Sequence, residues 1–149
     1  MGYKILSKKE ICTNQYELTI EAPHITRNAK AGQFIILRVS EDGERIPLTI
    51  SDFDASEGTV TIVTQIIGES SAEICSYEVG DSFADVVGPL GNPSDFISLP
   101  AEELAAKHYV FIAGGVGTAP VYPQVKWLHE KGVAVDVIIG ARNKDLLIY

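Results

Sequence analysis

The sequence contains very little cysteine and no long apolar run. Its two cysteines, Cys12 and Cys75, lie far apart, and no histidine stands near either one at metal-ligand spacing. Neither a zinc site nor an iron–sulfur site can be built from these residues alone, and free thiols in a reducing cytoplasm are expected. No apolar run reaches the roughly 18 residues of a membrane span. The N-terminus also lacks the apolar stretch of a signal peptide.

Basic residues are scarce as well. The chain has 12 Lys and Arg against 20 Asp and Glu, so its formal net charge is 12 − 20 = −8. This balance argues against a nucleic-acid partner, because binding to phosphates needs clustered Lys and Arg. Apolar residues make up 46% of the 149 residues and charged residues 21%, which is enough to build a core. One ordinary domain or two small ones are expected.

The first hundred residues have the pattern of short strands separated by turns. Residues 15–22 alternate polar and apolar side chains, as a strand with one solvated face does, and Asp42-Gly43 is typical of a hairpin. Six short strands are expected, which predicts an all-β antiparallel barrel or sandwich. The clearest strands are 15–22, 33–39, 45–51, 59–67 and 82–87. A short helix is expected over 70–77, and 88–93 is expected to be the loop that ends this unit.

The pattern changes after residue 107. Residues 109–113 form an unbroken apolar run, which is typical of a strand buried on both faces. A glycine-rich turn over 114–117 follows, then an expected helix over 119–131 and a second apolar strand over 133–140. Together these segments predict one βαβ unit. Residues 145–148 predict the opening of another helix.

Two strands are fewer than the about five or six that a doubly wound nucleotide-binding domain needs. We therefore interpret the α/β part as truncated and the chain as a fragment of a longer protein. The expected domains are a β-barrel over 1–100 and an incomplete α/β domain over 101–149. The strands of that second part would expose apolar edges, which pair readily with other chains. Self-association of the fragment is expected.

The sharpest local signal is the run Gly114-Gly115-Val116-Gly117-Thr118-Ala119-Pro120. Glycines let the backbone approach a pyrophosphate, and a helix N-terminus offers free N–H groups and a positive dipole end. A tight turn without a ligand remains the alternative, since Pro120 stands where the dinucleotide fingerprint has its third glycine. Arg142, after the second strand, favours the 2′-phosphate of NADP(H), although a solvated arginine explains it equally well.

Two further signals lie in the first part. In Arg45-Ile46-Pro47-Leu48-Thr49-Ile50-Ser51, an arginine opens an apolar strand, where it can hold a diphosphate. Its proline removes a ladder donor, which places the strand at an edge or beside a bound group. In Gly68-Glu69-Ser70-Ser71, small residues and hydroxyls precede a short helix and can bind an anion, although Ser70 can equally serve as a helix cap.

The order of these motifs, with Gly88-Pro89-Leu90-Gly91 between them, resembles the ferredoxin–NADP reductase superfamily. Within it, the chain is most similar to small electron-transfer flavoprotein subunits. These include the alpha subunit of NADH-dependent ferredoxin–NADP oxidoreductase, the sulfide dehydrogenase subunit and the dihydroorotate dehydrogenase electron-transfer subunit. The resemblance covers essentially all of the chain. It implies a Greek-key barrel that binds FAD, followed by a domain that binds NAD(P)H.

The resemblance also implies roles for individual residues. Arg45 would pair with the FAD diphosphate, and Pro47, Leu48 and Thr49 would line its isoalloxazine or ribityl side. Backbone contacts from Val63, Thr64 and Gln65 would flank the adenosine. Phosphate would be held at the short helix by Gly68, Ser70 and Ser71. The nicotinamide cofactor would meet Gly114, Gly115, Val116, Gly117, Thr118 and Ala119.

Such subunits carry a C-terminal cysteine cluster for a 2Fe–2S centre, which would lie beyond Tyr149. The first hypothesis is therefore the FAD-binding part of an NAD(P)H-dependent oxidoreductase subunit in the cytoplasm. Its partners would be a larger flavoprotein or iron–sulfur subunit and ferredoxin. On its own, the chain is expected to bind FAD weakly and turn over poorly. No side chain is an obvious catalytic acid or base, which suits chemistry carried by a flavin. The alternatives are a non-catalytic assembly module and a regulatory nucleotide-binding domain.

Overall fold

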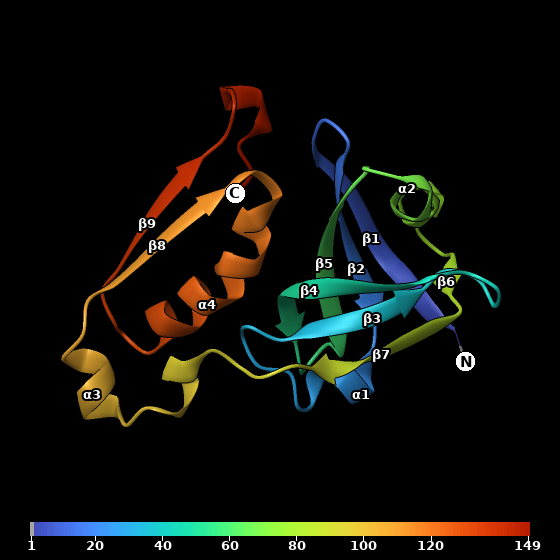
Figure 1. Cartoon of the computed structure of the whole chain (residues 1–149). Helices are drawn as coiled ribbons and strands as arrows, with labels where there is room; N and C mark the ends of the chain where they lie inside the picture. The colour runs from blue at the N-terminus through green and yellow to red at the C-terminus, as the bar shows by residue number, and fades with distance from the viewer. Residues whose placement is uncertain (1) are drawn as a thin grey trace.

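The computed structural model describes residues 2–149, which form a β-barrel and a smaller α/β part (Figure 1). The barrel strands are β1 (Tyr3–Cys12), β2 (Gln15–Glu21), β3 (Phe34–Arg38), β4 (Arg45–Asp54), β5 (Thr59–Gln65), β6 (Ser82–Phe83) and β7 (Asp85–Leu90). Two helices accompany them, α1 (Pro23–Thr26) and α2 (Glu69–Ser76). The second part contains α3 (Ala101–Ala105), β8 (Tyr109–Gly114), α4 (Thr118–Glu130) and β9 (Val135–Gly140). Three 3₁₀ turns complete the chain, η1 (Asp95–Ser98), η2 (Gly115–Gly117) and η3 (Lys144–Leu146).

The seven barrel strands are antiparallel and follow the order β6-β1-β2-β5-β4-β3-β7. Strands β3, β4 and β5 form two successive hairpins, and β2, which precedes them in the chain, lies beside β5. This arrangement is a Greek key. The end strands β6 and β7 are separated only by Ala84, whose amide donates to the Val39 carbonyl at 3.0 Å. The sheet is therefore nearly closed, and the predicted fold class is confirmed.

The barrel interior is filled by alternate residues of the strands. In β2, for example, Leu18 and Ile20 are fully buried, whereas the residue between them is half-buried. Burying one large aliphatic side chain contributes about 1.5 to 3 kcal/mol. The core residues of the barrel are Ile5, Leu18, Ile20, Ala22, Ile25, Ala29, Ile35, Leu37, Val39, Ile50, Val60, Ile62, Ile74, Phe83 and Val86.

Strand β4 changes its partner halfway along, and this opens the barrel. Its first half pairs with β3, from Arg38↔Arg45 to Phe34↔Thr49. Its second half pairs with β5, beginning at Ile50↔Ile62. One edge of residues 45–49 therefore has no strand beside it. Pro47 lies in this stretch, as expected for a residue without a ladder donor.

In the α/β part, β8 and β9 are parallel, and α4 lies between this sheet and the barrel (Figure 1). The predicted βαβ unit is therefore present. The expectation that the strand over 109–113 is buried on both faces was wrong. The exposed fractions of Val110, Ile112 and Ile138 are 54, 78 and 56%. These side chains share one face, because the helices of this chain cover only the other.

Three local predictions were also wrong. The strand expected over 82–87 is two strands, β6 and β7. The chain pairs with β1 before Ala84 and with β3 after it, so the strand is interrupted there. The loop expected over 88–93 begins only after Leu90, since β7 is an end strand in which Pro89 costs no inner ladder bond. The helix expected over 145–148 is only a 3₁₀ turn, and the following Ile148 is buried against the barrel.

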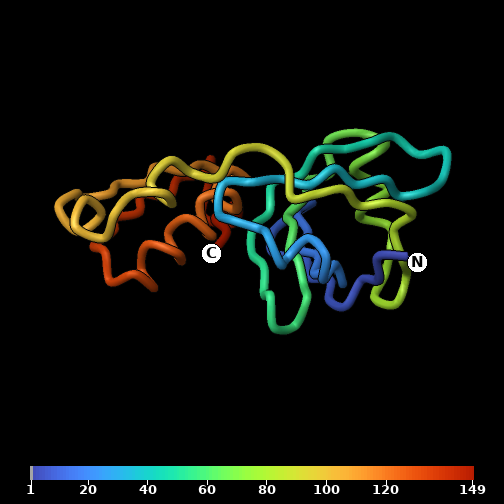
Figure 2. Tube along the Cα trace, turned by 90° about the horizontal axis from the view of Figure 1, so that it is seen from below, coloured from blue at the N-terminus to red at the C-terminus, as the bar shows by residue number. Residues whose placement is uncertain are grey.

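The chain's last residues lie between its two parts, whereas β1 begins at the far side of the barrel (Figure 2). Ile148 packs with Val63 of β5 and Ala119 of α4. The Tyr149 hydroxyl donates to Glu17 Oε2 on β2 at 2.8 Å. Burial, followed by this carboxylate, raises the pKa of the Tyr149 phenol. Across residues 2–149, no helix has both the length and the apolar character that crossing a membrane requires.

Candidate functional site

The opening beside β4 is the first of two adjoining clefts. It has a volume of about 350 Å³ and lies between β4, β5, the start of α2 and the glycine-rich turn that leads into α4. Most of its lining is apolar, with a few hydroxyl and amide groups. The lining residues are Ile46, Pro47, Leu48, Thr49, Val63, Thr64, Gln65, Ile67, Ser71, Val116, Gly117, Ala119 and Pro120. The cleft could hold a flat, largely apolar group between the two parts of the chain.

The second cleft is more polar and has a volume of about 470 Å³. It lies between the start of β4 and the start of α2, and its lining residues are Glu44, Arg45, Ile46, Pro47, Ile67, Gly68, Glu69, Ser70 and Ser71. Ile46, Pro47, Ile67 and Ser71 line both clefts. The two clefts are therefore one continuous groove with an apolar half and a polar half.

The N-terminus of α2 opens into the polar half. The amides of Ile67 and Gly68 donate to Ser71 Oγ at 2.9 and 3.0 Å, and this hydroxyl donates to the Gly68 carbonyl at 2.9 Å. The first backbone bond of the helix joins the Ala72 amide to the Gly68 carbonyl at 3.0 Å. The amides of residues 69–71 come before this first bond, so they have no partner in the helix and can bind an anion. A Cβ atom at Gly68 would meet no atom within 4 Å, so the backbone here is open to a ligand.

Two side chains of the polar half bind carboxylates of the protein. Arg45 Nη1 donates to Asp85 Oδ2 on β7 at 3.1 Å, and the arginine side chain is 54% exposed. Ser70 Oγ donates to the Glu44 carboxylate, which comes from the loop between β3 and β4. Both Arg45 and Ser70 are thus fixed beside the groove by acidic neighbours.

The glycine-rich turn closes the apolar half from the side of α4. Gly115 has a φ of +53°, a backbone conformation that a side chain would strain. No atom lies within 4 Å of a Cβ placed at Gly117, so this backbone is also open. Thr118 turns inward instead: it is buried, and its hydroxyl has no hydrogen-bond partner among residues 2–149.

The structure gathers most of the predicted site residues in this groove. Those that line it are Arg45, Pro47, Leu48, Thr49, Val63, Thr64, Gln65, Gly68, Ser70, Ser71, Val116, Gly117 and Ala119. Gly114, Gly115, Thr118 and Arg142 do not line it. Arg142 is exposed just beyond β9, at the sheet edge where the glycine-rich turn leaves β8. Residues 63–65 share the apolar half with Thr49 and Val116, and their expected adenosine role stays a prediction.

Sequence reasoning missed several residues of the groove. Ile67 and Pro120 line its apolar half, and Ile67 is 84% exposed, which is unusual for a large aliphatic side chain. The isoleucine pair Ile66-Ile67, placed after the strand and directly before the Gly68 turn, is a signal that could have indicated it. Glu44 and Asp85 were missed because no local pattern shows which basic or hydroxyl group a carboxylate will contact.

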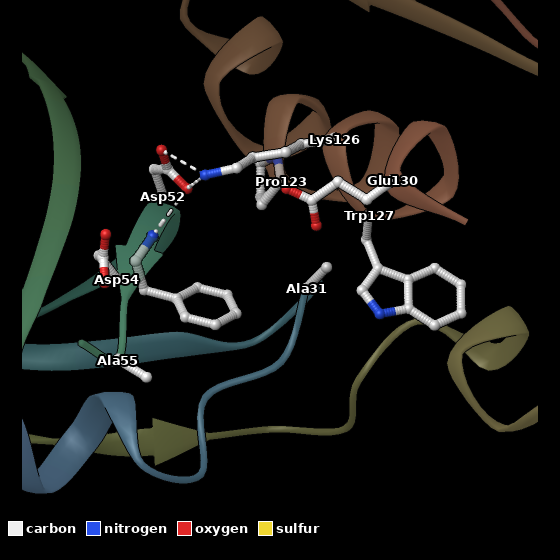
Figure 3. A pocket seen from close by; sticks show the side chains of 9 residues that line it. Ala31, Asp52, Asp54, Ala55, Pro123, Lys126, Trp127 and Glu130 are labelled. Atoms are coloured by element: carbon white, nitrogen blue, oxygen red, sulfur yellow. Dashed lines mark hydrogen bonds and ion pairs between the residues drawn. The ribbon is translucent and has the colours of Figure 1, made fainter. Parts of the chain in front are cut away.

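On another side of α4, a hollow of about 300 Å³ lies between the helix and the barrel. Figure 3 shows Lys126 of α4 reaching the Asp52 carboxylate on β4, and Nζ donates to its two oxygens at 2.8 and 3.0 Å. Partial burial would lower the pKa of Lys126, but the hydrogen bond and the charge of Asp52 outweigh it and raise this pKa. The ion pair joins the two parts beside the groove.

Comparison with known proteins agrees with this arrangement. The chain is 59% identical over 147 residues to an uncharacterised protein of Clostridium beijerinckii, covering 99% of this chain and 50% of that protein. It is 37% identical over 145 residues to a dihydroorotate dehydrogenase B (NAD(+)) electron transfer subunit homolog of Thermotoga maritima, covering 97% and 49%. The chain thus spans about half the length of these curated relatives. No family model matches it.

Among solved structures, the chain resembles the structure of the NADH-dependent reduced ferredoxin–NADP oxidoreductase, a protein studied for flavin-based electron bifurcation. The TM-score is 0.88 with 36% identity, over 100% of this chain and 51% of that one. In fold and sequence together, the chain resembles oxidoreductases of the ferredoxin–NADP reductase superfamily. Within it, its relatives are electron-transfer subunits of the dihydroorotate dehydrogenase B type.

Proposed function

We propose that the chain is the FAD-binding part of an electron-transfer oxidoreductase subunit. The subunit would move electrons between NAD(P)H and an iron–sulfur centre or ferredoxin. The observation that carries this proposal is the continuous groove with an apolar and a polar half. FAD has the same division, with a flat ring system at one end and a charged diphosphate in the middle. The groove's two halves therefore match the two parts of this one cofactor.

In this proposal, the polar half holds the diphosphate. Arg45 provides a charged, planar donor, and Ser70, Ser71 and the open backbone at Gly68 provide further donors at the start of α2. In the apolar half, Pro47, Leu48 and Thr49 line one side of the flavin ring. Residues 63–65 of β5 line the ring or its ribityl chain, as an alternative to the adenosine role expected from the sequence.

FAD supplies the redox chemistry when bound, since a flavin can take a hydride and release single electrons. The protein's own groups would bind and orient it. The nicotinamide cofactor would approach from the glycine-rich turn, where Val116, Gly117 and Ala119 face the same half of the groove. Arg142 lies at the same sheet edge and could contact a 2′-phosphate. The electron partner would be a larger flavoprotein or iron–sulfur subunit.

The proposal is tested by titrating the chain with FAD and following flavin absorbance and fluorescence. FAD should bind measurably in this titration, and Arg45→Gln should weaken its binding roughly 10- to 100-fold, because a hydrogen bond to a charged group is lost. Riboflavin, which has no phosphate, should bind both proteins alike. Arg27→Gln is the matched control, since Arg27 is exposed and lines neither cleft. A folded chain that leaves flavin absorbance and fluorescence unchanged at every FAD concentration would contradict the proposal and favour a non-catalytic assembly module.

A further inference from the structure

The two side chains best suited to hold phosphate oxygens already have acidic partners in the protein. Arg45 donates to Asp85 at 3.1 Å, and Ser70 donates to Glu44. Carboxylate and phosphate oxygens accept hydrogen bonds from the same donors. A diphosphate in the polar half would therefore compete with these carboxylates.

The charges around the polar half strengthen this competition. Glu44 and Glu69 are the acidic residues of its lining and Arg45 is the basic one. Behind them, Asp85 pairs with Arg45, and Arg38 lies opposite Arg45 in the β3–β4 ladder. A diphosphate adds further negative charge. The carboxylates and the diphosphate would repel one another within this cleft, although solvent and salt screen the repulsion at an exposed site.

We propose that Glu44 is a built-in competitor for the diphosphate at the start of α2. Its carboxylate engages the Ser70 hydroxyl and thereby weakens phosphate binding at the helix N-terminus. The inference rests on the proposed FAD site. Glu44 acts through Ser70 and is thus a positioning residue. It comes from the exposed β3–β4 loop, so it can withdraw without disturbing a strand, whereas Asp85 lies within β7.

The variant Glu44→Gln tests this inference, because glutamine has nearly the same size but no charge, and its amide oxygen holds the Ser70 hydroxyl less strongly than a carboxylate does. We expect the dissociation constant for FAD to fall roughly two- to fivefold, as is typical of one exposed charge interaction. The dissociation constant for riboflavin should not change. Raising the salt concentration should reduce the difference between the variant and the wild type.

Two comparisons isolate the role of Ser70. Glu41→Gln removes the same charge from the same exposed loop, and it should change FAD binding much less. Within residues 2–149, the Glu41 carboxylate makes no hydrogen bond or ion pair; only its backbone carbonyl accepts, from Arg38. In a Ser70→Ala background, Glu44→Gln should have little further effect. The inference would be overturned if Glu41→Gln tightened FAD binding as much as Glu44→Gln does. It would also be overturned if Glu44→Gln tightened FAD binding just as much in the Ser70→Ala background.

Failure of the inference can be separated from failure of the proposed function. If the wild type binds FAD and Glu44→Gln binds it no more tightly, the competition is refuted and the FAD site stands. If riboflavin binding improves as much as FAD binding, the effect does not involve phosphate and the inference is refuted. If neither protein binds FAD, both the inference and the proposed function are wrong.

Discussion

Lys126 of α4 donates to both carboxylate oxygens of Asp52 of β4, at 2.8 and 3.0 Å. The two residues belong to different parts of the chain. Helix α4 begins at the glycine-rich turn, and β4 begins at Arg45. This ion pair therefore helps to fix the two walls of the apolar half relative to each other.

Replacing Asp52 by Asn should lower the free energy of unfolding by about 1 kcal/mol, because the partly buried Lys126 ammonium loses its charged partner. Asparagine can still accept the hydrogen bond that the Phe53 amide donates to Asp52 Oδ1 at 2.9 Å. The change should also lower the pKa of Lys126 and weaken FAD binding. Urea unfolding at low and high salt measures the first effect. Asp42→Asn, in an exposed loop, is the control, and an equal loss there would contradict the role of the pair.

Much of the fold was predictable because it depends on local patterns. The alternation in residues 15–22 predicted β2, and the unbroken apolar run over 109–113 predicted β8. The order of the four motifs predicted the superfamily. The β4 partner change at Ile50 was not predictable, since it depends on how two hairpins twist apart.

The site was predictable where a motif carries its own chemistry, as at Arg45 and at the glycine-rich turn. The partners of these residues were not. Asp52 and Lys126 are 74 residues apart, and the Glu44 contact with Ser70 depends on where one loop lies. The outer face of β8 was misjudged because an apolar strand does not itself show how many layers cover it.

Removing the Ser71 hydroxyl should loosen the start of α2. Ser71→Ala loses the acceptor for the Ile67 and Gly68 amides, and the loss of such a cap costs about 1 kcal/mol. FAD should bind more weakly as well, because the amides at the helix start become less ordered. Ser71→Thr should restore most of both properties. Ser76→Ala, at the other end of α2, is the control. Calorimetry and FAD titration together measure the effects, and unchanged FAD binding would exclude the helix start from the site.

The two cysteines should differ in reactivity. Burial raises the pKa of the Cys75 thiol to about 11, although the Lys8 ammonium opposes this shift. Because the thiolate is the reactive form, iodoacetamide near neutral pH should modify the half-exposed Cys12 first and Cys75 only on unfolding. Mass spectrometry of the labelled protein tests this, and equal labelling rates would contradict it.

The same raised pKa makes stability depend on pH. In the folded chain the Cys75 thiol keeps its proton to a higher pH. Its contribution to the free energy of unfolding is therefore fully present below the ordinary thiol pKa of 9.0. Above that pH the unfolded chain loses the proton first, and stability falls as the pH rises towards 11. Cys75→Ala should lack this part of the decline. Urea unfolding of both proteins across this range measures the difference.

The exposed face of β8 and β9 should make the chain self-associate. Val110, Ile112 and Ile138 lie together there, since Ile112 pairs directly with Ile138 in the parallel ladder. Exposed apolar patches and free strand edges favour contact with a second copy. Ile112→Lys should shift the chain towards a monomer in sedimentation velocity and light scattering over a range of concentrations. Val79→Lys, which changes an exposed valine of the barrel part, should leave the association unchanged. A wild-type chain that stays monomeric at every concentration would rule out this use of the face.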